Sequence, residues 1–401
     1  MTSPGRIGLF TPGWPGQNTP NGIATSVYHL AMGLHEIGQT PVIIAEHIDG
    51  VVPADIPVIH IPQLDWRWQD RLRAKLGSPD AGHWYRSRNI AAAVREAIDT
   101  YALNALIIEE TNGWAGMVQS LVPVPVIITL HGPWVLHKAL QSVTDTKGDQ
   151  LRESRENRAF GLAAGLISPS RNVLDAMEKA APLPDIPKSV LPNTLPAQTD
   201  EPPSAALEPR DILFIGRFDN HKGGDTVLAA FMRLIDTHPQ ARLTFAGVDK
   251  GVRRKDGSVI HIEAALAALP TAVRARITHK GPVDREEVAE LRAGHAIALI
   301  ASRYENLNYT LLEAMAAGQA IVCTAVGGPA EVLEDGQTAL LVPPDDPDAM
   351  AAALGRLMDD ATLARHLGAT ALARLESDFN PAIIAARTKA FVETVLARGA
   401  P

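Results

Sequence analysis

Two glutamates separated by seven residues, Glu305 and Glu313, lie in the segment RYENLNYTLLE, which directly follows an apolar run. Carboxylates accept hydrogen bonds from hydroxyl groups, so such a pair could hold a sugar and a ribose side by side. Asn308 is a favourable helix N-cap, and a helix that begins after it would leave Glu305 on the preceding loop and Glu313 one turn inside. The alternative interpretation is a helix with two solvated acidic residues.

Cationic residues follow another apolar run, in the segment GRFDNHKGGDT. The planar guanidinium of Arg217 and the ammonium group of Lys222 suit phosphate oxygens, and a helix is expected to begin just after them. Backbone N–H groups near Tyr309 and Thr310, at the start of the helix with the second glutamate, could hold an anion in the same way. Two solvated surface cations are the alternative for this segment.

Three loops in the N-terminal half carry further candidates. A Gly-rich loop ends at Gly22, where a ligand could approach the backbone closely. His131 follows the apolar run VIITL, although a lone histidine is as often structural as functional. The segment IIEETNGWAG places Glu109, Glu110 and Trp114 at another predicted strand end, where an acid could orient an acceptor hydroxyl and the indole could stack on a sugar ring.

Buried strands that alternate with helices must position all of these residues. Short apolar runs such as RIGLFTP, PVIIAEH and VPVIITLH alternate with amphipathic stretches, and the alternation restarts with DILFIGRF, ARLTFAGV and AIALIAS. This pattern predicts an α/β protein with two doubly wound, Rossmann-like domains that face a central cleft. Ligands of such sheets bind beyond the carboxyl ends of the strands, where the candidate residues fall.

The domain boundaries follow from changes in composition. We predict an N-terminal domain over residues 1–195, a linker rich in Pro, Ala and acids over 196–209, and a C-terminal domain over 210–378. A last amphipathic helix is expected at about 380–398. Asp346, Pro347 and Asp348 resemble a metal-binding Asp-x-Asp pair, but their position before a helical stretch predicts an N-cap instead.

Composition excludes several classes of protein. The 401 residues carry a net charge of −8, which argues against bulk affinity for nucleic acid, although it leaves room for a local basic patch. The single cysteine, Cys323, allows no internal disulfide, and no apolar stretch is long enough to span a membrane or to act as a signal peptide, so a cytoplasmic protein is expected. WRWQDRLRAKL and HWYRSRN combine aromatics with arginines and could meet the inner membrane surface, a lipid-linked phosphate or an anionic glycan; the alternative is a solvated helical excursion.

The C-terminal half resembles a known family in its longest motif, RYENLNYTLLEAMAAGQAIVCTAVGGPAEVLEDGQTALLVPPDDP. It is similar to the donor-binding segment of the retaining GT-B glycosyltransferases with the Glu-x7-Glu signature (glycosyltransferase family four, "glycosyl transferases group 1"). GRFDNHKGGDTVLAAF resembles the Gly-Arg…Lys-Gly segment of that family, and NGIATSVYHLAMGLHEIG, VIITLHG, LISPSRNV and VLPNT are weaker matches.

The resemblance implies a retaining hexosyltransferase with a nucleotide-diphosphate sugar as donor and no cofactor or metal. It implies that Arg217 and Lys222 bind the diphosphate and stabilise it as it leaves, that Glu305 contacts the donor sugar, and that Glu313 binds the ribose. Other implied donor contacts come from His131, from the backbone of Gly22, and from the residues after the first glutamate, which are Asn306, Leu307, Asn308, Tyr309 and Thr310. It also implies that the last helix crosses back to the N-terminal domain.

One departure concerns the sequence between the two glutamates. The family commonly has Glu-Gly-Phe-Gly where this chain has Glu305, Asn306, Leu307 and Asn308, so both glycines are absent. If those positions need a positive φ angle, Asn tolerates it better than most residues. The departure bears on the identity of the donor sugar.

The acceptor and the mechanism are less constrained by sequence. A glycan, a lipid-linked molecule or a small molecule would each fit as acceptor. Because no second carboxylate near the sugar offers a covalent nucleophile, we expect the leaving diphosphate to deprotonate the acceptor on the same face of the sugar. Two alternatives are a nucleotide-sugar-binding protein without catalysis and a dinucleotide-dependent oxidoreductase; the latter lacks a G-x-G-x-x-G motif after either first strand.

Overall fold

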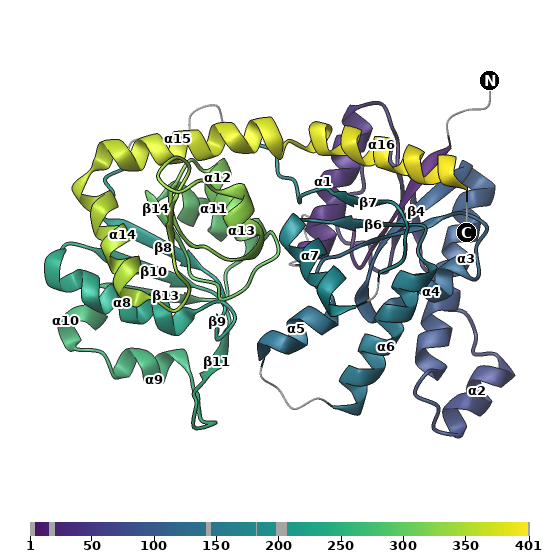
Figure 1. The fold of residues 1–401 in the computed structure, drawn as a ribbon, viewed down its shortest axis with the longest axis horizontal. Helices are drawn as coiled ribbons and strands as arrows, with labels where there is room; N and C mark the ends of the chain where they lie inside the picture. Colours follow the sequence, from purple (N-terminus) through teal and green to yellow (C-terminus); the bar gives the residue numbers. More distant parts are fainter. Residues whose placement is uncertain (1–4, 16–20, 142–145, 182, 198–206, 400–401) are drawn as a thin grey trace. The chain divides into compact units, whose positions relative to one another are not determined.

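The computed structural model describes residues 5–15, 21–141, 146–181, 183–197 and 207–399 (Figure 1). The chain divides into two compact units. Unit 1 comprises Met1–Thr194 and Pro381–Pro401, and unit 2 comprises Leu195–Asn380. Most of the expected linker, residues 198–206, and residues 16–20 of the Gly-rich loop that ends at Gly22 lie outside the described residues.

Unit 1 contains a seven-stranded sheet in which all neighbouring strands are parallel, in the order β3-β2-β1-β4-β5-β6-β7. The strands are β1 (Arg6–Thr11), β2 (Val42–Ala45), β3 (Val58–His60), β4 (Leu103–Glu109), β5 (Val126–Thr129), β6 (Gly165–Ser168) and β7 (Lys188–Val190). The strand order reverses between β1 and β4. The carboxyl ends of these two strands therefore flank the point at which sheets of this kind bind ligands.

Helices cover both faces of this sheet. They are α1 (Gly22–Glu36), α2 (Trp68–Lys75), α3 (Ala81–Tyr101), the 3₁₀ turn η2 (Thr111–Gly113), α4 (Trp114–Gln119), α5 (Trp134–Gln141), α6 (Lys147–Leu162), α7 (Arg171–Ala180) and α16 (Pro381–Arg398). One hydrophobic core joins the sheet to α3, α4, α6 and α7, and a second core joins it to α1 and α16. Because both faces are covered, inner strands such as β2 (VIIA) and β5 (VIIT) are nearly continuous apolar runs, as the sequence predicts.

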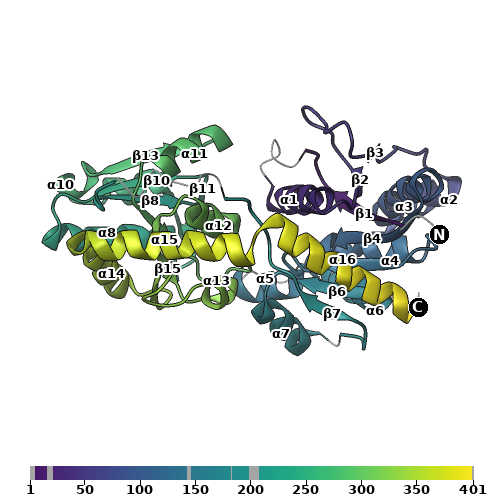
Figure 2. The same ribbon diagram turned by 90° about the horizontal axis from the view of Figure 1, so that it is seen from above.

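Helix α16 is part of unit 1 although most of unit 1 lies before residue 195. It packs along α1, as Figure 2 shows from above. The contact is close, since a Cβ atom at Gly33 of α1 would stand 2.2 Å from the carbonyl oxygen of Pro381. Phe391, Val392 and Val395 complete the core on this face of the sheet.

Unit 2 has a second parallel sheet, of six strands, in the order β13-β10-β8-β14-β15-β16, and a small three-stranded sheet in the order β12-β11-β9. The strands are β8 (Asp211–Ile215), β9 (Phe218–Asp219), β10 (Arg242–Ala246), β11 (Asp249–Arg253), β12 (Val259–Ile260), β13 (Ile277–Gly281), β14 (Ile297–Ile300), β15 (Ala320–Thr324) and β16 (Leu340–Val342). Here the strand order reverses between β8 and β14. The small sheet, with its β11–β12 hairpin, is not predicted by the alternation of apolar runs.

The helices of unit 2 again lie on both faces. They are α8 (Gly224–Thr237), α9 (Ile262–Ala267), α10 (Thr271–Arg274), α11 (Arg285–Ala293), α12 (Tyr309–Ala316), α13 (Gly327–Val332), α14 (Pro347–Asp359) and α15 (Ala361–Asp378). One core contains α8 and α14, and the other contains α12 and α15. Two predicted caps are confirmed: Asn308 accepts from the N–H of Leu311 at 2.9 Å, and Asp346 accepts from the N–H of Ala349 at 2.9 Å.

Candidate functional site

The loops after β8 and β14 bring together the main candidates of unit 2. These strands are neighbours in the sheet, and the strand order reverses between them. The loop after β8 carries Arg217 and Lys222, and the loop after β14 carries Glu305. The candidates therefore gather at the topological switch point, where an open α/β sheet leaves room for a ligand.

Lys222 and Glu305 form a shielded ion pair across these two loops. The ammonium nitrogen of Lys222 lies 2.5 Å from Oε2 of Glu305, and the hydroxyl group of Ser302 donates to the same oxygen at 2.9 Å. Glu305 is 8% exposed, so both hydrogen bonds act in a poorly hydrated environment. A charge buried in this way is tolerated only when it is paired and hydrogen-bonded, so each residue of the pair depends on the other.

Glu305 and the neighbouring His221 both have pKa values below their ordinary ones, for different reasons. Burial acts to raise the pKa of Glu305, but the ammonium group of Lys222 and the side chain of His221 outweigh it and hold the pKa below its ordinary value. Burial lowers the pKa of His221, whose Nε2 lies 2.7 Å from the carbonyl oxygen of Tyr304. At neutral pH this corner therefore presents a carboxylate that can accept from hydroxyl groups, next to a fixed cation.

Asp219 sets the shape of the loop after β8. One of its carboxylate oxygens accepts from the N–H of Lys222 at 2.7 Å, and the other accepts from Nε of Arg217 at 2.6 Å. The side chain of Arg217 is 46% exposed and so can be reached by a ligand. Gly223 closes the turn with φ +68°, and a Cβ atom there would stand 2.1 Å from the carbonyl oxygen of Ala301.

Arg303 braces the loop after β14, a role that sequence reasoning missed. Its guanidinium group forms two hydrogen bonds with the carboxylate of Asp225, at 3.0 and 2.9 Å, and a third with Asp345 at 2.5 Å. It also donates to the carbonyl oxygen of Asn220 at 2.5 Å. The side chain of Arg303 thus connects the loop after β14 to the loop after β8 and to the start of α8. The signal in the sequence was an arginine three residues after the end of a buried strand.

The segment between the two glutamates is held by tight backbone packing. Gly328 donates its N–H to the carbonyl oxygen of Glu305 at 3.1 Å, and a Cβ atom at Gly328 would stand 1.7 Å from the carbonyl oxygen of Asn306. The side chain of Leu307 is buried in the core that contains α12. Asn308 has φ −86°. Among the described residues that are not glycine, a positive φ occurs only at Ala102, Asn112 and Asp345, so the absent family glycines are not replaced by strained asparagines.

Glu313 has a buried cation as its neighbour, which sequence reasoning also missed. It lies in α12, as predicted, and its Oε2 is 3.4 Å from a guanidinium nitrogen of Arg292 in α11. Arg292 is 3% exposed and also donates to Gln319 Oε1 and to the carbonyl oxygen of Thr310, both at 2.8 Å. Glu313 is thus oriented from the protein side by one long contact, while its side chain stays 30% exposed.

Two buried carboxylates hold the loop after β5 in unit 1. Glu110 accepts from the backbone N–H groups of His131 and Gly132, at 2.8 and 2.6 Å. Glu156 accepts from the N–H groups of Trp134 and Asn112, at 2.7 and 3.2 Å. Burial raises the pKa of Glu110 to about 7, against the opposing effect of these backbone donors. Glu110 therefore holds the backbone of His131 and Gly132 in place in the loop after β5.

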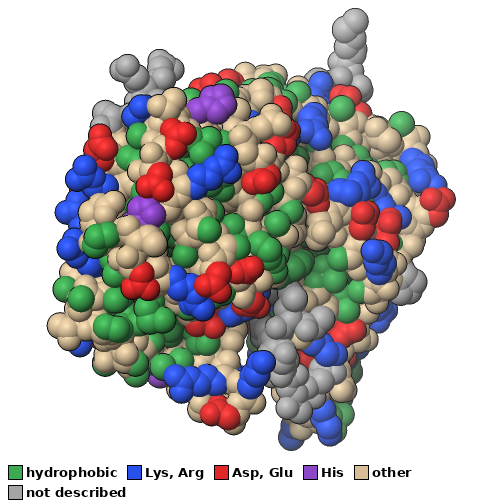
Figure 3. Space-filling model, turned by 60° about the vertical axis from the view of Figure 1, so that its left-hand side comes forward, with side chains coloured by type: hydrophobic (Ala, Val, Ile, Leu, Met, Phe, Trp, Pro, Cys, Tyr) green, Lys and Arg blue, Asp and Glu red, His purple; other side chains and the backbone are tan. Residues whose placement is uncertain are grey.

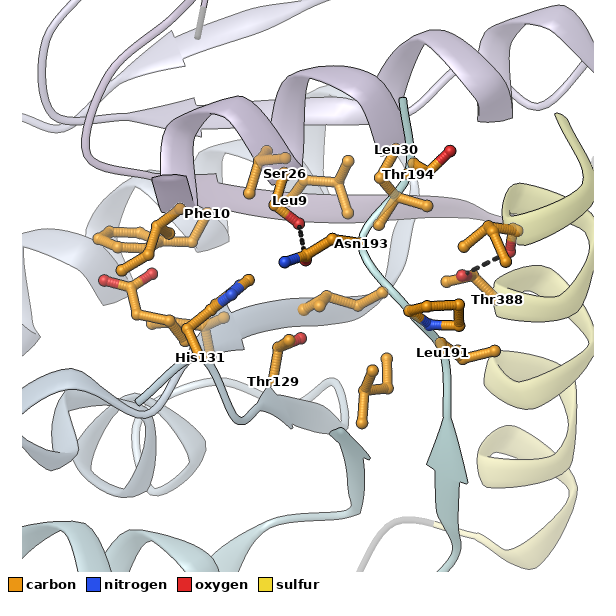
Figure 4. Close-up of a pocket in the computed structure, with 18 residues that line it drawn as sticks. Leu9, Phe10, Ser26, Leu30, Thr129, His131, Leu191, Asn193, Thr194 and Thr388 are labelled. Carbon is orange, nitrogen blue, oxygen red and sulfur yellow. Dashed lines mark hydrogen bonds between the residues drawn. The ribbon is translucent and has the colours of Figure 1, made fainter. Parts of the chain in front are cut away.

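His131 lines a pocket that is built entirely from unit 1, as Figure 4 shows. Burial lowers the pKa of His131 to about 4, so the imidazole is neutral at physiological pH. The pocket also has polar groups from α1, β5 and the segment after β7, and Asn193 accepts a hydrogen bond from Ser26 at 3.0 Å. A neutral imidazole beside an amide and hydroxyl groups can bind an uncharged polar group such as a sugar hydroxyl.

Glu109 lines the same pocket from the end of β4. It is 5% exposed, and within the part of the chain that the structure describes its Oε2 is buried without a hydrogen-bond partner. Burial, followed by the charge of Glu110, raises the pKa of Glu109 to about 8. A neutral carboxyl group both donates and accepts, and a hydroxyl group that entered the pocket could satisfy the orphaned oxygen.

Glu109 is expected to make the stability of the folded protein depend on pH. Its pKa in the folded state, about 8, lies above its ordinary value of 4.5, so the stability associated with the neutral form is present in full below about pH 4.5 and is lost as the pH rises toward 8. Glu109→Gln removes this loss. Thermal melts should show wild type and variant to be similar near pH 5 and the variant several degrees more stable at pH 8.

The control is Glu290→Gln, which removes an exposed carboxylate from α11. It should leave the pH dependence of the wild type unchanged. A constant difference between Glu109→Gln and wild type from pH 5 to pH 8 would show that Glu109 is ionised in the folded protein.

Other sequence candidates of unit 1 lie outside the lining of this pocket. Trp114 packs against the core that contains residues of α3, and the guanidinium group of Arg86 lies over its ring at 5.2 Å. Glu110 is absent from the lining as well. Gly22 begins α1 after the N-cap Asn21, and a Cβ atom on Gly22 would meet nothing within 4 Å. The surroundings of Gly22 would therefore accommodate a larger side chain, and they do not by themselves indicate that a ligand binds there.

Comparison with known proteins identifies the family. Residues 20–198 match the model described as Glycosyltransferase Family 4, and residues 209–360 match the model described as Glycosyl transferases group 1. The chain belongs to glycosyltransferase family 4. A glycogen synthase from Mycobacterium tuberculosis is 33% identical over 190 residues, which is 46% of this chain and 44% of that relative. The chain thus matches less than half the length of this curated relative.

Solved structures show that the fold is GT-B. A sucrose-phosphate synthase from Thermosynechococcus elongatus aligns with 99% of this glycosyltransferase family 4 chain and with 100% of its own, with a TM-score of 0.74 and 21% identity. The Anabaena protein HepE in complex with UDP aligns with 97% of this chain and 100% of its own, with a TM-score of 0.68 and 16% identity. The predicted pair of doubly wound α/β sheets is confirmed.

The described residues of this family member bear on metals and membranes in two ways. None of its described helices is both long and apolar enough to cross a bilayer. Over the same residues, His, Cys, Asp and Glu side chains nowhere form a group of three that could hold a metal ion.

Proposed function

We propose that this protein is a retaining glycosyltransferase that moves a hexosyl group from a nucleotide-diphosphate sugar to an acceptor hydroxyl. The observation that carries the proposal is the pair of Lys222 and Glu305 at the switch point of unit 2. A fixed cation suits a diphosphate, and a carboxylate 2.5 Å away suits the hydroxyl groups of the attached sugar. Membership of glycosyltransferase family 4 supports this assignment.

The donor is proposed to lie along unit 2. Arg217 and Lys222 bind the diphosphate, Glu305 accepts from the sugar hydroxyls, and Glu313 accepts from the ribose hydroxyls. Backbone N–H groups from Asn306 to Thr310 add to the donor site, whereas the side chain of Leu307 is buried in the core. The solved HepE complexes contain UDP and UDP-glucose, which supports a uridine nucleotide as the first to test.

The proposed reaction needs no covalent enzyme intermediate. The bond between the anomeric carbon and the diphosphate oxygen breaks, and the acceptor oxygen forms the new bond on the same face of the sugar. The acceptor proton passes to an oxygen of the leaving diphosphate, whose charge Lys222 and Arg217 stabilise. Glu305 is bound to Lys222 and Ser302, which suits a hydroxyl-binding group better than a nucleophile.

Unit 1 is proposed to bind the reacting hydroxyl groups through its pocket. His131 contributes a neutral imidazole, and the backbone of Gly22 is proposed to approach the diphosphate. Glu109, with its orphaned oxygen, is the acid that we assign to an acceptor hydroxyl. Glu110 is assigned to positioning, because both of its oxygens are used by backbone N–H groups. The acceptor is a glycan, a lipid-linked molecule or a small molecule.

A thermal-shift panel of UDP-, GDP- and ADP-sugars tests the proposal. A ligand that binds only the folded state raises the melting temperature, so the correct donor should stand out from the others. Release of free nucleotide diphosphate on addition of acceptor then separates a transferase from a protein that only binds nucleotide sugars. If no nucleotide sugar shifts the melting curve, the proposed donor site is wrong.

Glu313→Ala is expected to weaken donor binding about 10- to 100-fold with a small change in kcat, because a hydrogen bond to a charged group is lost in the ground and transition states alike. Arg292 keeps its bonds to Gln319 and Thr310 in this variant, so the fold should persist. Titration calorimetry with the free nucleotide diphosphate gives the affinity. Glu290→Ala, on the exposed side of α11, is the matched control, and equal affinities for both variants would remove the ribose assignment.

A further inference from the structure

Helix α2 of unit 1 turns its apolar side chains outward. Trp68, Leu72 and Leu76 follow one another at intervals of four residues, and they are 71%, 47% and 76% exposed. Residues at this spacing share one side of a helix, so the three form a stripe along α2 and the residue just after it. An outward-facing apolar stripe of this kind is unusual, because surface helices normally bury it against the core.

The opposite side of α2 carries the charge that would ordinarily face water. Asp70 is 5% exposed and accepts from the guanidinium group of Arg88 in α3 at 2.5 Å. The stacked rings of Trp66 and Tyr85, with centroids 4.9 Å apart, hold the segment that leads into the helix. The helix is thus anchored to the protein through an ion pair, and its apolar stripe is left without a described partner.

All exposed charges of α2 are positive. Arg71, Arg73 and Lys75 are exposed, and the only acid of the helix is the buried Asp70. Arg73 also lies over the ring of Trp84 at 5.0 Å, which joins a fourth large apolar side chain, itself 37% exposed, to the patch. This contrasts with the face in Figure 3, where cationic and anionic side chains alternate, and with the net charge of −8.

We propose that α2 binds the surface of a bilayer that contains anionic phospholipids. The stripe of Trp68, Leu72 and Leu76 would enter the region between head groups and acyl chains, where an indole is favoured, and the three cations would lie among the lipid phosphates. A stable protein–protein interface needs an area of about 1,200 Å² or more, which three side chains of a short helix do not supply. The observed pairing of an apolar stripe with uniform positive charge complements a lipid surface instead.

Vesicle co-sedimentation tests this proposal with the full chain. Vesicles of phosphatidylcholine alone are compared with vesicles that also contain phosphatidylglycerol. The wild type should bind the anionic vesicles at least tenfold more tightly and should lose most of this binding in high salt. Trp68→Ser/Leu72→Ser/Leu76→Ser and, separately, Arg71→Gln/Arg73→Gln/Lys75→Gln should each reduce binding at least tenfold.

Matched controls lie in unit 2. Met232→Ser/Val248→Ser removes exposed apolar side chains, and Lys250→Gln/Arg254→Gln/Lys255→Gln removes charges from the β11–β12 hairpin; both should bind like the wild type. The proposal is overturned if the wild type binds neither type of vesicle. It is equally overturned if the hairpin variant loses vesicle binding while the α2 variants keep it. It is also overturned if the serine variant converts a dimer to a monomer, which would identify a second copy as the partner. Melting curves with nucleotide sugars report on the donor site separately.

Discussion

Lys222→Ala is expected to lower kcat about 10²- to 10³-fold, which is the effect of removing one preorganised charge from a developing anion. The variant loses the cation proposed to stabilise the departing diphosphate. It also removes the ammonium group from beside the carboxylate of Glu305, which is 8% exposed and keeps its hydrogen bond from the hydroxyl group of Ser302. Because the same cation contacts the ground state, a smaller rise in KM should accompany the loss. Steady-state release of nucleotide diphosphate measures both parameters.

Two further variants give this experiment its control. Lys250→Ala removes an exposed lysine of the small sheet in the same unit and should leave kcat unchanged. Lys222→Arg keeps the charge but replaces a compact ammonium group by a larger planar one, so it should recover only part of the activity. Wild-type kcat in Lys222→Ala would show that the ion pair is purely structural.

Gly328→Ala is expected to abolish measurable donor binding while the protein stays folded. The new Cβ atom would stand 1.7 Å from the carbonyl oxygen of Asn306, so the backbone of the segment after Glu305 has to move. Overpacking of this kind costs about 1–3 kcal/mol of stability. Moving the segment also displaces the carboxylate from Lys222 and the N–H groups before α12. Donor titrations and thermal melts separate the two effects.

Gly161→Ala provides the matched control for that substitution. Gly161 lies in α6 of unit 1, and a Cβ atom there would meet nothing within 4 Å. Alanine favours a helix over glycine, so this variant should be as stable as the wild type or slightly more stable. If Gly328→Ala binds donor as well as Gly161→Ala does, the segment between the glutamates adapts freely and does not position the site.

The sequence predicts the parts of the site that depend on local order along the chain. The segment that contains Glu305 directly follows an apolar run, and Asn308 has the side chain of an N-cap, so the end of β14 and the start of α12 could be placed without a structure. The positions of Arg217 and Lys222 after β8 follow from the same rule. Because strand ends of a parallel sheet gather at one edge, local prediction was enough to bring these residues near one another.

Contacts between distant residues could not be predicted in this way. The bond from Arg292 to Glu313 and the bonds from Glu110 to the histidine loop each join separate elements whose packing no local pattern encodes. Asp70 is a clearer case, since an acid in a charged helix is normally solvated, whereas here it is buried against Arg88. Each of these groups is buried and polar, and its partner is set by tertiary packing alone.

Helix α16 is synthesised last but belongs to unit 1, and this affects the order in which the two units can fold. Unit 2 is continuous in sequence, so its sheets and helices can assemble once residues 195–380 have left the ribosome. Unit 1 begins earlier, but its core also contains Phe391, Val392 and Val395 of α16, which are made last. The half that is made first is thus completed last. Until then the face of its sheet that α16 covers stays open, and nascent chains released at about residue 380 should depend on chaperones that shield apolar surface.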